Sequence, residues 1–489
     1  MCIRDRYKDD PAAHWICDGS PEYSLKKSEK KERGTEIILH ISKDSKDYLE
    51  ESKISELLNK YNKFMPHPIK FGTKEETIPG KEGEKEEKVT IDNIINNPNP
   101  AWTKTPADLK DEDYKQFYRE LYPYQFEEPL FHIHLNVDYP FNLTGILYFP
   151  KISNDLNLQK DRIQLYQNQV FVTDNVEGIV PEFLGLLKGV IDSPDIPLNV
   201  SRSYLQSDAS VKKITNYITR KVADKLNSIF KNERENLESK WNDIKVVIEY
   251  GMLTEDKFYD KAESFNLYPT VDDKYFTYEE LEKKIKKLQT DKDGNLIILY
   301  AQNRDEQYTY IESAKEKGYE VLLLDSPIIP HLMQKLESKK EKIKFSRVDS
   351  DTLENLIKKD EEVISKLTDE EKEKLKPMIE TAVENEKYTV QLEALDSNSM
   401  PFMLAQPEFM RRMKEMQQTG GGAMGNLPDM YSLIVNTNHE LVGKILNTRT
   451  KKKRNSLIKQ SVDLAKLSQN NLTGKDLTEF INRSIDLIK

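Results

Sequence analysis

One long stretch near the middle of the chain decides the fold: "VFVTDNVEGIVPEFLGLLKGVIDSPDIPLNVSRSYLQ", residues 170–206. It begins as a strand and a turn, and then "VPEFLGLLKGVID" predicts a helix over 180–192 with Phe183, Leu184, Leu187 and Val190 on one face. An acidic turn follows, and the loop after it carries a single arginine, Arg202. Spacing alone favours a surface arginine paired with Asp192 or Asp195, because exposed pairs of this kind are common and weak.

Strands and helices alternate on both sides of this stretch, which predicts an α/β layered domain over residues 98–355. Upstream there is a helix carrying Tyr114, Phe117, Tyr118 and Leu121, then two strands over 129–150 and a strand or strand pair over 163–174. Downstream, residues 209–244 are helical. A smaller α/β unit with a parallel element is predicted further along the chain, from residues 295–302, 314–327 and 342–350.

The two ends of the chain differ from this middle part. In residues 1–72, "RGTEIILHI" at 33–41 predicts a buried strand, and the residues after it predict an amphipathic helix. Residues 73–97 are rich in Glu and Lys and predict a solvated linker. Residues 356–489 predict a mostly helical α+β domain, with strands over 388–395 and 431–436.

Two helices close the chain, and the second carries an apolar stripe. This stripe consists of Leu477, Ile481, Ile485 and Ile488. Because a hairpin at a chain end cannot cover both of its faces with a small sheet, we expect a homodimer formed through this domain.

Composition excludes several classes of protein. The 489 residues carry a net charge of −10 and a mean hydropathy of −0.72, which argues against a nucleic-acid binder. There is no apolar run long enough for a membrane span and no signal peptide, so we expect no membrane partner. The only two cysteines allow one disulfide at most and favour a reducing, cytoplasmic location. His132 and His134 could supply two metal ligands without an evident third, so no metal site is predicted.

Several of these segments together resemble the heat shock protein 90 family of molecular chaperones, in its bacterial form. The resemblance rests on residues 33–41, on "YPYQFEEPLFHIHLN" at 122–136, on "GILYFP" at 145–150, on residues 165–206 and on "VNTNHELVGKIL" at 435–446. It implies the remnant of a GHKL-type ATP-binding sandwich over 1–72. It also implies a middle domain like ribosomal protein S5 domain 2 with a small α/β unit, and a C-terminal dimerisation domain.

The resemblance assigns a role to the arginine loop. In this family the matching arginine reaches the γ-phosphate of ATP, so Arg202 becomes a catalytic residue, with Asn199 and Gln206 supporting its loop. Phe171 is either plain core or part of the same support.

The nucleotide pocket itself has few counterparts in this chain. Gly34 and Thr35 match the adenine end of the pocket, whereas the family's magnesium-holding asparagine and general-base glutamate have no counterpart. Residues 1–6 match no part of the pattern and are excluded from the fold assignment. ATP and Mg²⁺ are therefore cofactors of the complete protein, and this chain alone is expected to lack ATPase activity.

Two places are candidates for binding client proteins. Trp102 is either a surface staple at a helix start or a client contact. A methionine-rich segment is either a core helix or an exposed client-binding helix, and its prolines and Gly420–Gly422 favour the second. Its candidate residues are Phe402, Phe409, Met410, Met413 and Met416.

Two functions remain open. The chain is a homodimeric clamp for unfolded or partly folded clients, driven in the complete protein by ATP, or it is a non-catalytic client-binding and dimerisation module. The sequence has no Cys-His pair, no G-x-S-x-G and no complete phosphate loop, so a free-standing hydrolase has no support.

Overall fold

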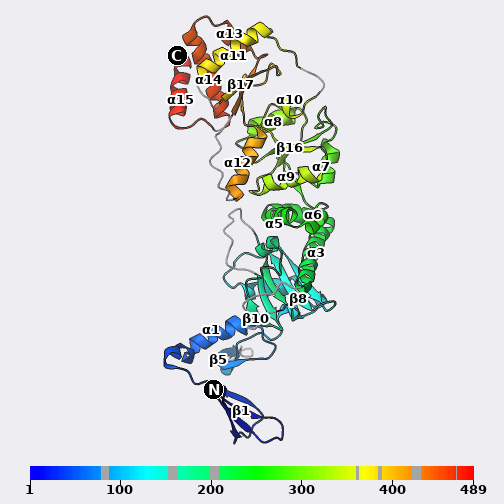
Figure 1. Ribbon diagram of the computed structural model, residues 1–489, viewed down its shortest axis with the longest axis vertical. Coiled ribbons are helices and arrows are strands. Elements are labelled where there is room, and N and C mark those ends of the chain that lie inside the picture. Colours follow the sequence, from blue (N-terminus) through cyan, green and yellow to red (C-terminus); the bar gives the residue numbers. More distant parts are fainter. Residues whose placement is uncertain are drawn as a thin grey trace.

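The chain is laid out along one long axis, with a small sheet at its N-terminal end and a helical unit at its C-terminal end (Figure 1). This computed structural model describes residues 1–78, 87–151, 163–197, 209–359, 363–383, 388–420, 431–469 and 471–488. The predicted fold class, a multidomain chain of α/β and α+β units, is confirmed.

The N-terminal unit is an antiparallel sheet in the order β3-β2-β1-β4. Its elements are β1 (Cys2–Arg6), β2 (Ala13–Ile16), β3 (Ser24–Lys27), β4 (Gly34–Ile38), a 3-10 helix (Lys43–Leu49) and α1 (Glu51–Tyr61). Residues 1–6, which match no part of the family pattern, contain β1, which lies between β2 and β4. One expectation fails here. The strand predicted to be buried, β4, is solvent-exposed, because no other described element covers Ile37, which is 60% exposed.

Residues expected to form an irregular linker pair instead as a two-stranded antiparallel ribbon, β5 (Lys70–Ile78) and β6 (Glu87–Ile94). Cross-strand ion pairs join Lys88 to Glu75 at 3.2 Å and Lys70 to Asp92 at 2.6 Å. The mixed charge that suggested a linker therefore lies on two paired strands, where opposite charges at diagonal positions favour pairing.

The large sheet of the middle region has the order β10-β9-β11-β8-β7. Its strands are β7 (Phe131–Val137), β8 (Leu143–Phe149), β9 (Ile163–Gln167), β10 (Val170–Thr173) and β11 (Lys188–Asp192). The helices around it are α2 (Asp111–Leu121), α3 (Ala209–Asn232), α4 (Arg234–Ser239), α5 (Trp241–Thr254) and α6 (Asp256–Ala262).

Each face of this sheet buries a separate core. Along β8, Leu143 and Leu147 face the core shared with α3 and α5, whereas Ile146 and Tyr148 face the core shared with α2. This alternation is the strand period of two, and it gives a three-layered unit. The aromatic face predicted for α2 is confirmed, since all four of its residues are buried.

The helix predicted over 180–192 is wrong. A short 3-10 helix (Glu182–Leu186) is followed by β11, which pairs with β8 on one side and β9 on the other. Gly189 explains the strand: its φ is +131°, and a Cβ there would collide with the backbone of Ile146. A continuous apolar run fits both a buried helix and a central strand, and the close approach of β8 decides between them.

The small α/β unit has the predicted parallel pairing, and its strands lie in the order β15-β14-β16. Its elements are β12 (Tyr268–Pro269), β13 (Tyr275–Phe276), α7 (Tyr278–Ile285), β14 (Leu296–Ala301), α8 (Tyr308–Glu316), β15 (Val321–Leu323), α9 (Ile329–Lys339), β16 (Ile343–Arg347) and α10 (Leu353–Leu356). Thr277 and Glu280 form a capping box that fixes the start of α7.

The C-terminal unit packs helices on a three-stranded sheet in the order β17-β19-β18. Its elements are α11 (Asp369–Val383), β17 (Tyr388–Glu393), β18 (Phe402–Ala405), α12 (Glu408–Gly420), β19 (Tyr431–Asn436), α13 (Glu440–Asn447), α14 (Lys451–Leu467) and α15 (Gly474–Ile488). Sequence reasoning missed β18 and assigned its residues to the methionine-rich segment.

Candidate functional site

The arginine loop starts from the carboxyl end of β11, where Asp192 is fixed by two donors. Its carboxylate accepts a hydrogen bond from Trp102 Nε1 at 3.2 Å and one from the backbone N–H of Gln169 at 2.8 Å. Burial raises the pKa of Asp192, and these two donors offset that shift in part. The strand end is therefore tied both to the β9–β10 hairpin and to the segment before α2.

Trp102 is one of the largest fully buried side chains of the described chain. Its indole packs against the rings of Phe64 at 4.8 Å, Tyr166 at 5.2 Å and Phe117 at 5.4 Å between centroids. Neither prediction for Trp102, a surface staple or a client contact, fits this position. Phe64 follows α1 and belongs to the N-terminal region predicted over residues 1–72. The segment after α1 therefore packs with the middle region.

The first residues of the loop itself are also anchored. Ser193 donates its hydroxyl proton to the carbonyl of Asn142 at 2.6 Å, and Asp195 accepts from the backbone N–H of Asn142 at 2.6 Å. Asp195 is thus engaged with backbone at the β7–β8 turn. Arg202, Asn199 and Gln206 lie outside the described residues. Phe171 packs at the edge of the Trp102 core, with its ring 5.7 Å from that of Tyr166.

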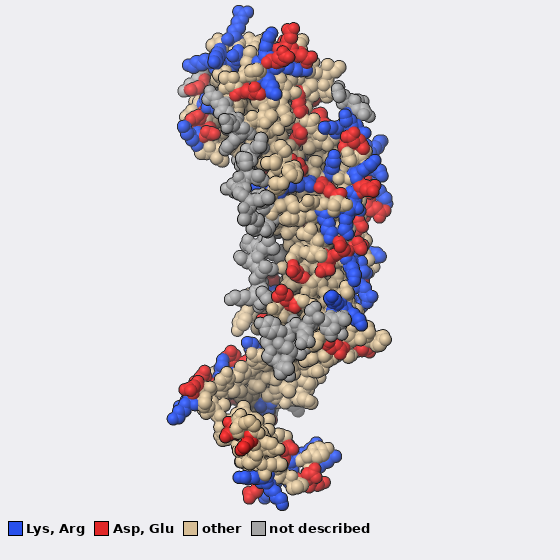
Figure 2. All heavy atoms as spheres, in the orientation of Figure 1, with Lys and Arg blue, Asp and Glu red and all other residues tan. Residues whose placement is uncertain are grey.

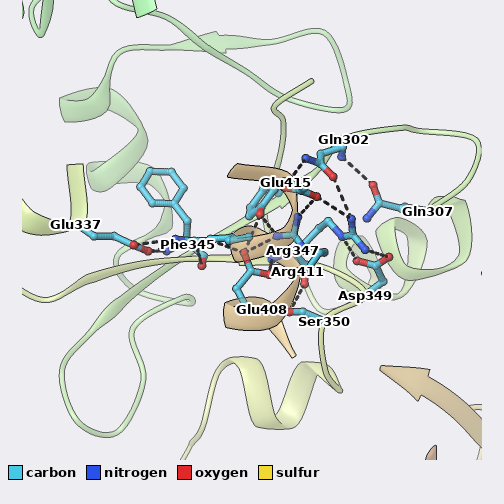
Figure 3. Close-up of polar contacts among 12 residues, drawn as sticks. Gln302, Gln307, Glu337, Phe345, Arg347, Asp349, Ser350, Glu408, Arg411 and Glu415 are labelled. Carbon is cyan, nitrogen blue, oxygen red and sulfur yellow. Dashed lines mark hydrogen bonds and ion pairs between the residues drawn. The ribbon is translucent and has the colours of Figure 1, made fainter. Parts of the chain in front are cut away.

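A second feature is α12, which belongs by chain order to the C-terminal unit but is anchored on the small α/β unit (Figures 1 and 3). Glu408 accepts from the Tyr300 hydroxyl at 2.7 Å and from Arg412 Nε at 2.6 Å. Arg412 also pairs with Glu337 of α9 at 2.8 Å. Burial pushes the pKa of Glu408 up, but Arg411 and Arg412 outweigh it and hold that pKa below its ordinary value.

The same network continues along the inner side of α12. Arg411 pairs with Glu408 at 2.6 Å and Glu415 at 2.5 Å, and its side chain is only 4% exposed. Arg347 of β16 donates to Gln302 at 3.0 Å and forms a two-pronged pair with Asp349. The residues of α12 that face the small unit are therefore its charged ones.

The apolar stripe of α12 lies on a different face. Phe409 is 69% exposed, and Met410, Met413 and Met416 are half-buried. Residues 408, 411, 412 and 415 follow helical spacing toward the small unit, whereas residues 409, 413 and 416 follow it on an adjacent flank. The charged residues thus contact the small unit, and Phe409 is the most exposed member of the apolar stripe.

Phe402 does not join this surface. It lies in β18, is 2% exposed and packs in the core of the C-terminal unit. Of the five client-binding candidates in this segment, the structure brings Phe409, Met410, Met413 and Met416 together on α12 and separates Phe402 from them.

Sequence reasoning missed an exposed aromatic loop between α2 and β7. Tyr124 is 90% exposed and Phe126 is 97% exposed. They border a hollow of about 520 Å³ whose wall includes Lys151, Lys188 and Asp243. The signal in the sequence is "YPYQFEEP", two aromatics held between prolines, which favours a loop rather than a packed element.

At the C-terminal end, α15 presents part of its apolar stripe to solvent. Ile481 is 47% exposed and Ile485 is 48% exposed. The helix is attached to α14 through an ion pair of Arg483 with Asp463 and a hydrogen bond of Gln460 to Ser484 at 2.8 Å. Arg483 and Ser484 of α15 therefore contact α14, whereas Ile481 and Ile485 lie at exposed positions.

At the opposite end of the chain, Gly34 and Thr35 lie on the exposed strand β4, where the Thr35 hydroxyl donates to Asp5 at 2.6 Å. His132 stacks on Tyr114 with ring centroids 3.7 Å apart, and the Tyr114 hydroxyl lies 2.9 Å from His134 Nδ1. Across the described ranges, no cluster of three or more His, Cys, Asp or Glu residues could hold a metal ion.

No helix within the described ranges combines the length and the apolar character that crossing a membrane requires. Figure 2 shows basic and acidic side chains intermixed along one flank of the molecule, without a face of one sign. Nucleic-acid binding needs a basic face, so the surface in this view does not favour it.

Comparison with known proteins shows one family. The model of the family described as "Hsp90 protein" matches residues 72–483. The chain belongs to the Hsp90 family. It is 48% identical to "Chaperone protein htpG" of Bacteroides fragilis strain YCH46, over 99% of this chain and 81% of that protein. It is 51% identical to "Chaperone protein HtpG" of Porphyromonas gingivalis strain ATCC 33277, over 96% of this chain and 68% of that protein.

The Hsp90 match covers most of the features described above. The root of the arginine loop, the aromatic loop and α12 all lie within it, as does α15 up to residue 483. Gly34 and Thr35 lie before its first matched residue. The resemblance stated from residues 122–136, 145–150, 165–206 and 435–446 is thereby confirmed.

Proposed function

We propose that this chain, a molecular chaperone of the Hsp90 family, holds non-native proteins on the outer face of α12. The observation that carries the proposal is the apolar stripe of α12. Phe409 is 69% exposed, and Met413 and Met416 are partly exposed, while Glu408 and Arg412 attach α12 to the small unit through a hydrogen bond from Tyr300 and an ion pair with Glu337. Methionine and phenylalanine at a surface can adapt to many apolar partners, which suits a protein that binds unrelated sequences.

The aromatic loop offers a second contact for the same clients. Tyr124 and Phe126 are more exposed than any other large apolar side chains in the described ranges. Exposed aromatics of this size favour binding to apolar segments of other proteins. We therefore transfer the client contact expected at Trp102 to this loop.

Photo-crosslinking tests the site directly. A photoreactive benzoylphenylalanine at position 409 should crosslink to reduced, carboxymethylated α-lactalbumin, a permanently unfolded protein. The matched control carries the same group at Lys283, whose side chain on α7 is 73% exposed. Equal crosslinking at 409 and 283 would contradict the proposal.

We further propose that two copies of the chain pair through α15. The support is the outward position of Ile481 and Ile485, since a two-fold partner presenting the same face would cover each stripe once. The bivalency of a dimer would strengthen the hold on a client with two apolar segments. Light scattering of the chain should therefore give the mass of a dimer.

The nucleotide part of the proposal rests on family membership. In it, ATP with Mg²⁺ drives the clamp of the complete protein, and Arg202 meets the γ-phosphate. The root of the loop supports this, because Asp192, Ser193 and Asp195 are all held by hydrogen bonds. Arg202→Ala in the complete protein should lower the turnover of ATP and leave its binding nearly unchanged. A loss of affinity at unchanged turnover would contradict this role.

The unpaired Cys2 and Cys17 favour a reducing compartment, and we place the protein in the cytoplasm.

A further inference from the structure

The strand β16 lies at the edge of the parallel sheet of the small unit. Its even-numbered residues bond to β14: Val348 donates its N–H to the carbonyl of Tyr300 at 2.9 Å, and Lys342 accepts from Leu296 at 2.7 Å. Because the backbone groups of a strand alternate in direction, the N–H and C=O groups of the odd-numbered residues point away from the sheet. An edge of this kind is a template for another strand.

Charged side chains, rather than a strand, occupy that edge (Figure 3). The N–H of Phe345 donates to Glu337 Oε1 at 2.7 Å, and its carbonyl accepts from the guanidinium of Arg412. The N–H of Arg347 donates to Glu408 Oε2 at 3.2 Å. Of the four outward groups of Phe345 and Arg347, two are thus satisfied by α12 and one by a carboxylate that itself pairs with Arg412. The fourth, the carbonyl of Arg347, accepts from the N–H and hydroxyl of Ser350.

We propose that α12 is a plug over a strand-pairing site, and that this edge receives an extended segment of a non-native protein when α12 lifts away. The N–H groups of Phe345 and Arg347 repeat at the spacing of a strand, two residues apart, with the carbonyl of Phe345 between them, and a polypeptide backbone offers the matching donors and acceptors. Only the identity of the occupant rests on the proposed chaperone function. The plug itself rests on the contacts of β16.

The attachment of α12 is of a kind that can be released. It consists of ion pairs and hydrogen bonds, whose attraction is offset by the cost of removing the charges from water. Arg411 is 3% exposed as a residue, and its Nε has no partner among the described residues. A buried donor left without a partner costs free energy, so the docked position is not the best that these groups could reach.

Chain order supplies a reason for the plug to move. The helix leaves the C-terminal sheet after β18 and returns to it at β19, while its charges hold β16 and α9 of the small unit. Any rotation of the C-terminal unit against the small unit must therefore stretch this contact. The same motion would uncover the edge of β16 and shift the apolar stripe of α12.

Hydrogen exchange of the full chain, read at single-residue resolution by mass spectrometry, tests the plug. In Arg412→Ala and in the isosteric Glu408→Gln, the amides of Phe345 and Arg347 should exchange about 10- to 100-fold faster than in the unaltered chain. The amides that bond to β14, including that of Val348, should keep their protection. The control is Lys283→Ala, which removes an exposed ion pair on α7 and should leave all of these amides unchanged.

A synthetic peptide then tests the occupant. The sequence Lys-Val-Thr-Val-Thr-Val-Thr-Lys should restore protection to Phe345 and Arg347 in both variants. Two further peptides carry N-methyl groups on alternate residues, one peptide on the odd-numbered and the other on the even-numbered residues. Only one of the two should restore protection, because one set of amides faces β16 and the other set faces away from it.

Each outcome decides the matter. Unchanged exchange of the Phe345 and Arg347 amides in Glu408→Gln would overturn the plug. A loss of protection at Val348 as large as that at Phe345 and Arg347 would also overturn it, because the whole sheet rather than its edge would then have opened. Protection by both methylated peptides would overturn strand pairing. Crosslinking at Phe409 is independent of all these results, so the chaperone proposal and the plug can fail separately.

Discussion

Replacement of Trp102 by phenylalanine tests the anchoring of the arginine loop. The change keeps an aromatic ring among Phe64, Phe117 and Tyr166 but removes the Nε1–H that Asp192 accepts at 3.2 Å. A hydrogen bond to a charged group contributes about 1.5–3 kcal/mol. The smaller ring leaves a cavity that adds about 1 kcal/mol. We therefore expect Trp102→Phe to lower the free energy of unfolding of this sheet by about 2.5–4 kcal/mol.

The chain contains a matched control for this change. Trp241 is 1% exposed, and its Nε1–H has no hydrogen-bond partner within the described residues. Trp241→Phe therefore removes a buried indole without breaking a hydrogen bond, and it should cost about 1 kcal/mol or less. The difference between the two variants isolates the contribution of the bond to Asp192.

Native-state hydrogen exchange of the amides in β8 and β11 is the suitable assay, because a chain of several units does not unfold in one step. Both substitutions fall in cores that include β8. Equal losses of protection in Trp102→Phe and Trp241→Phe would refute the anchoring of Asp192 through the indole.

Three further predictions concern other parts of the chain. Burial, with Lys225 nearby, lowers the pKa of His132 to about 4 from an ordinary 6.5, so the unfolded state binds the proton more tightly than the folded state does. The free energy of unfolding should therefore fall as the pH drops from 6.5 towards 4. Urea titrations across that range should show a weaker fall in His132→Phe, which keeps the stacking on Tyr114. Ile481→Asp with Ile485→Asp should give the mass of a monomer in light scattering, and a persistent dimer would place the interface elsewhere. Gly189→Ala should destabilise the large sheet by about 3 kcal/mol or more, because the added Cβ meets the backbone of Ile146. In the same exchange assay, protection close to that of the unaltered chain would show that β8 and β11 can separate.

Local pattern was enough to predict much of the middle region. The aromatic face of α2 and the parallel order of β14, β15 and β16 follow from helical spacing and from the strand–helix–strand rule. The pattern failed for residues 180–192, because an apolar run fits a buried helix as well as a central strand. Within residues 180–192, Gly189 was the sign of the close approach of β8, and Gly145 on β8 is its counterpart.

The site depends more on contacts that are distant in sequence. A helical wheel shows which face of α12 is apolar, but the face that packs is chosen by Tyr300 and Glu337, more than 70 residues away from it in the chain. Trp102 is similar, because its partner Asp192 lies 90 residues later. Local sequence therefore identifies Phe409 and Met413 as an apolar pair and cannot say that they remain exposed.

The affinity for an unfolded protein, measured with and without the apolar stripe, tests the central claim most directly. Fluorescence anisotropy with labelled carboxymethylated α-lactalbumin compares the chain with the triple variant Phe409→Ser, Met413→Ser and Met416→Ser. The control is Ile364→Ser, which removes an apolar side chain that is 87% exposed elsewhere. We predict that the triple variant binds at least about tenfold more weakly and that the control binds as the unaltered chain does. Equal affinity of all three proteins would show that clients are held somewhere other than α12.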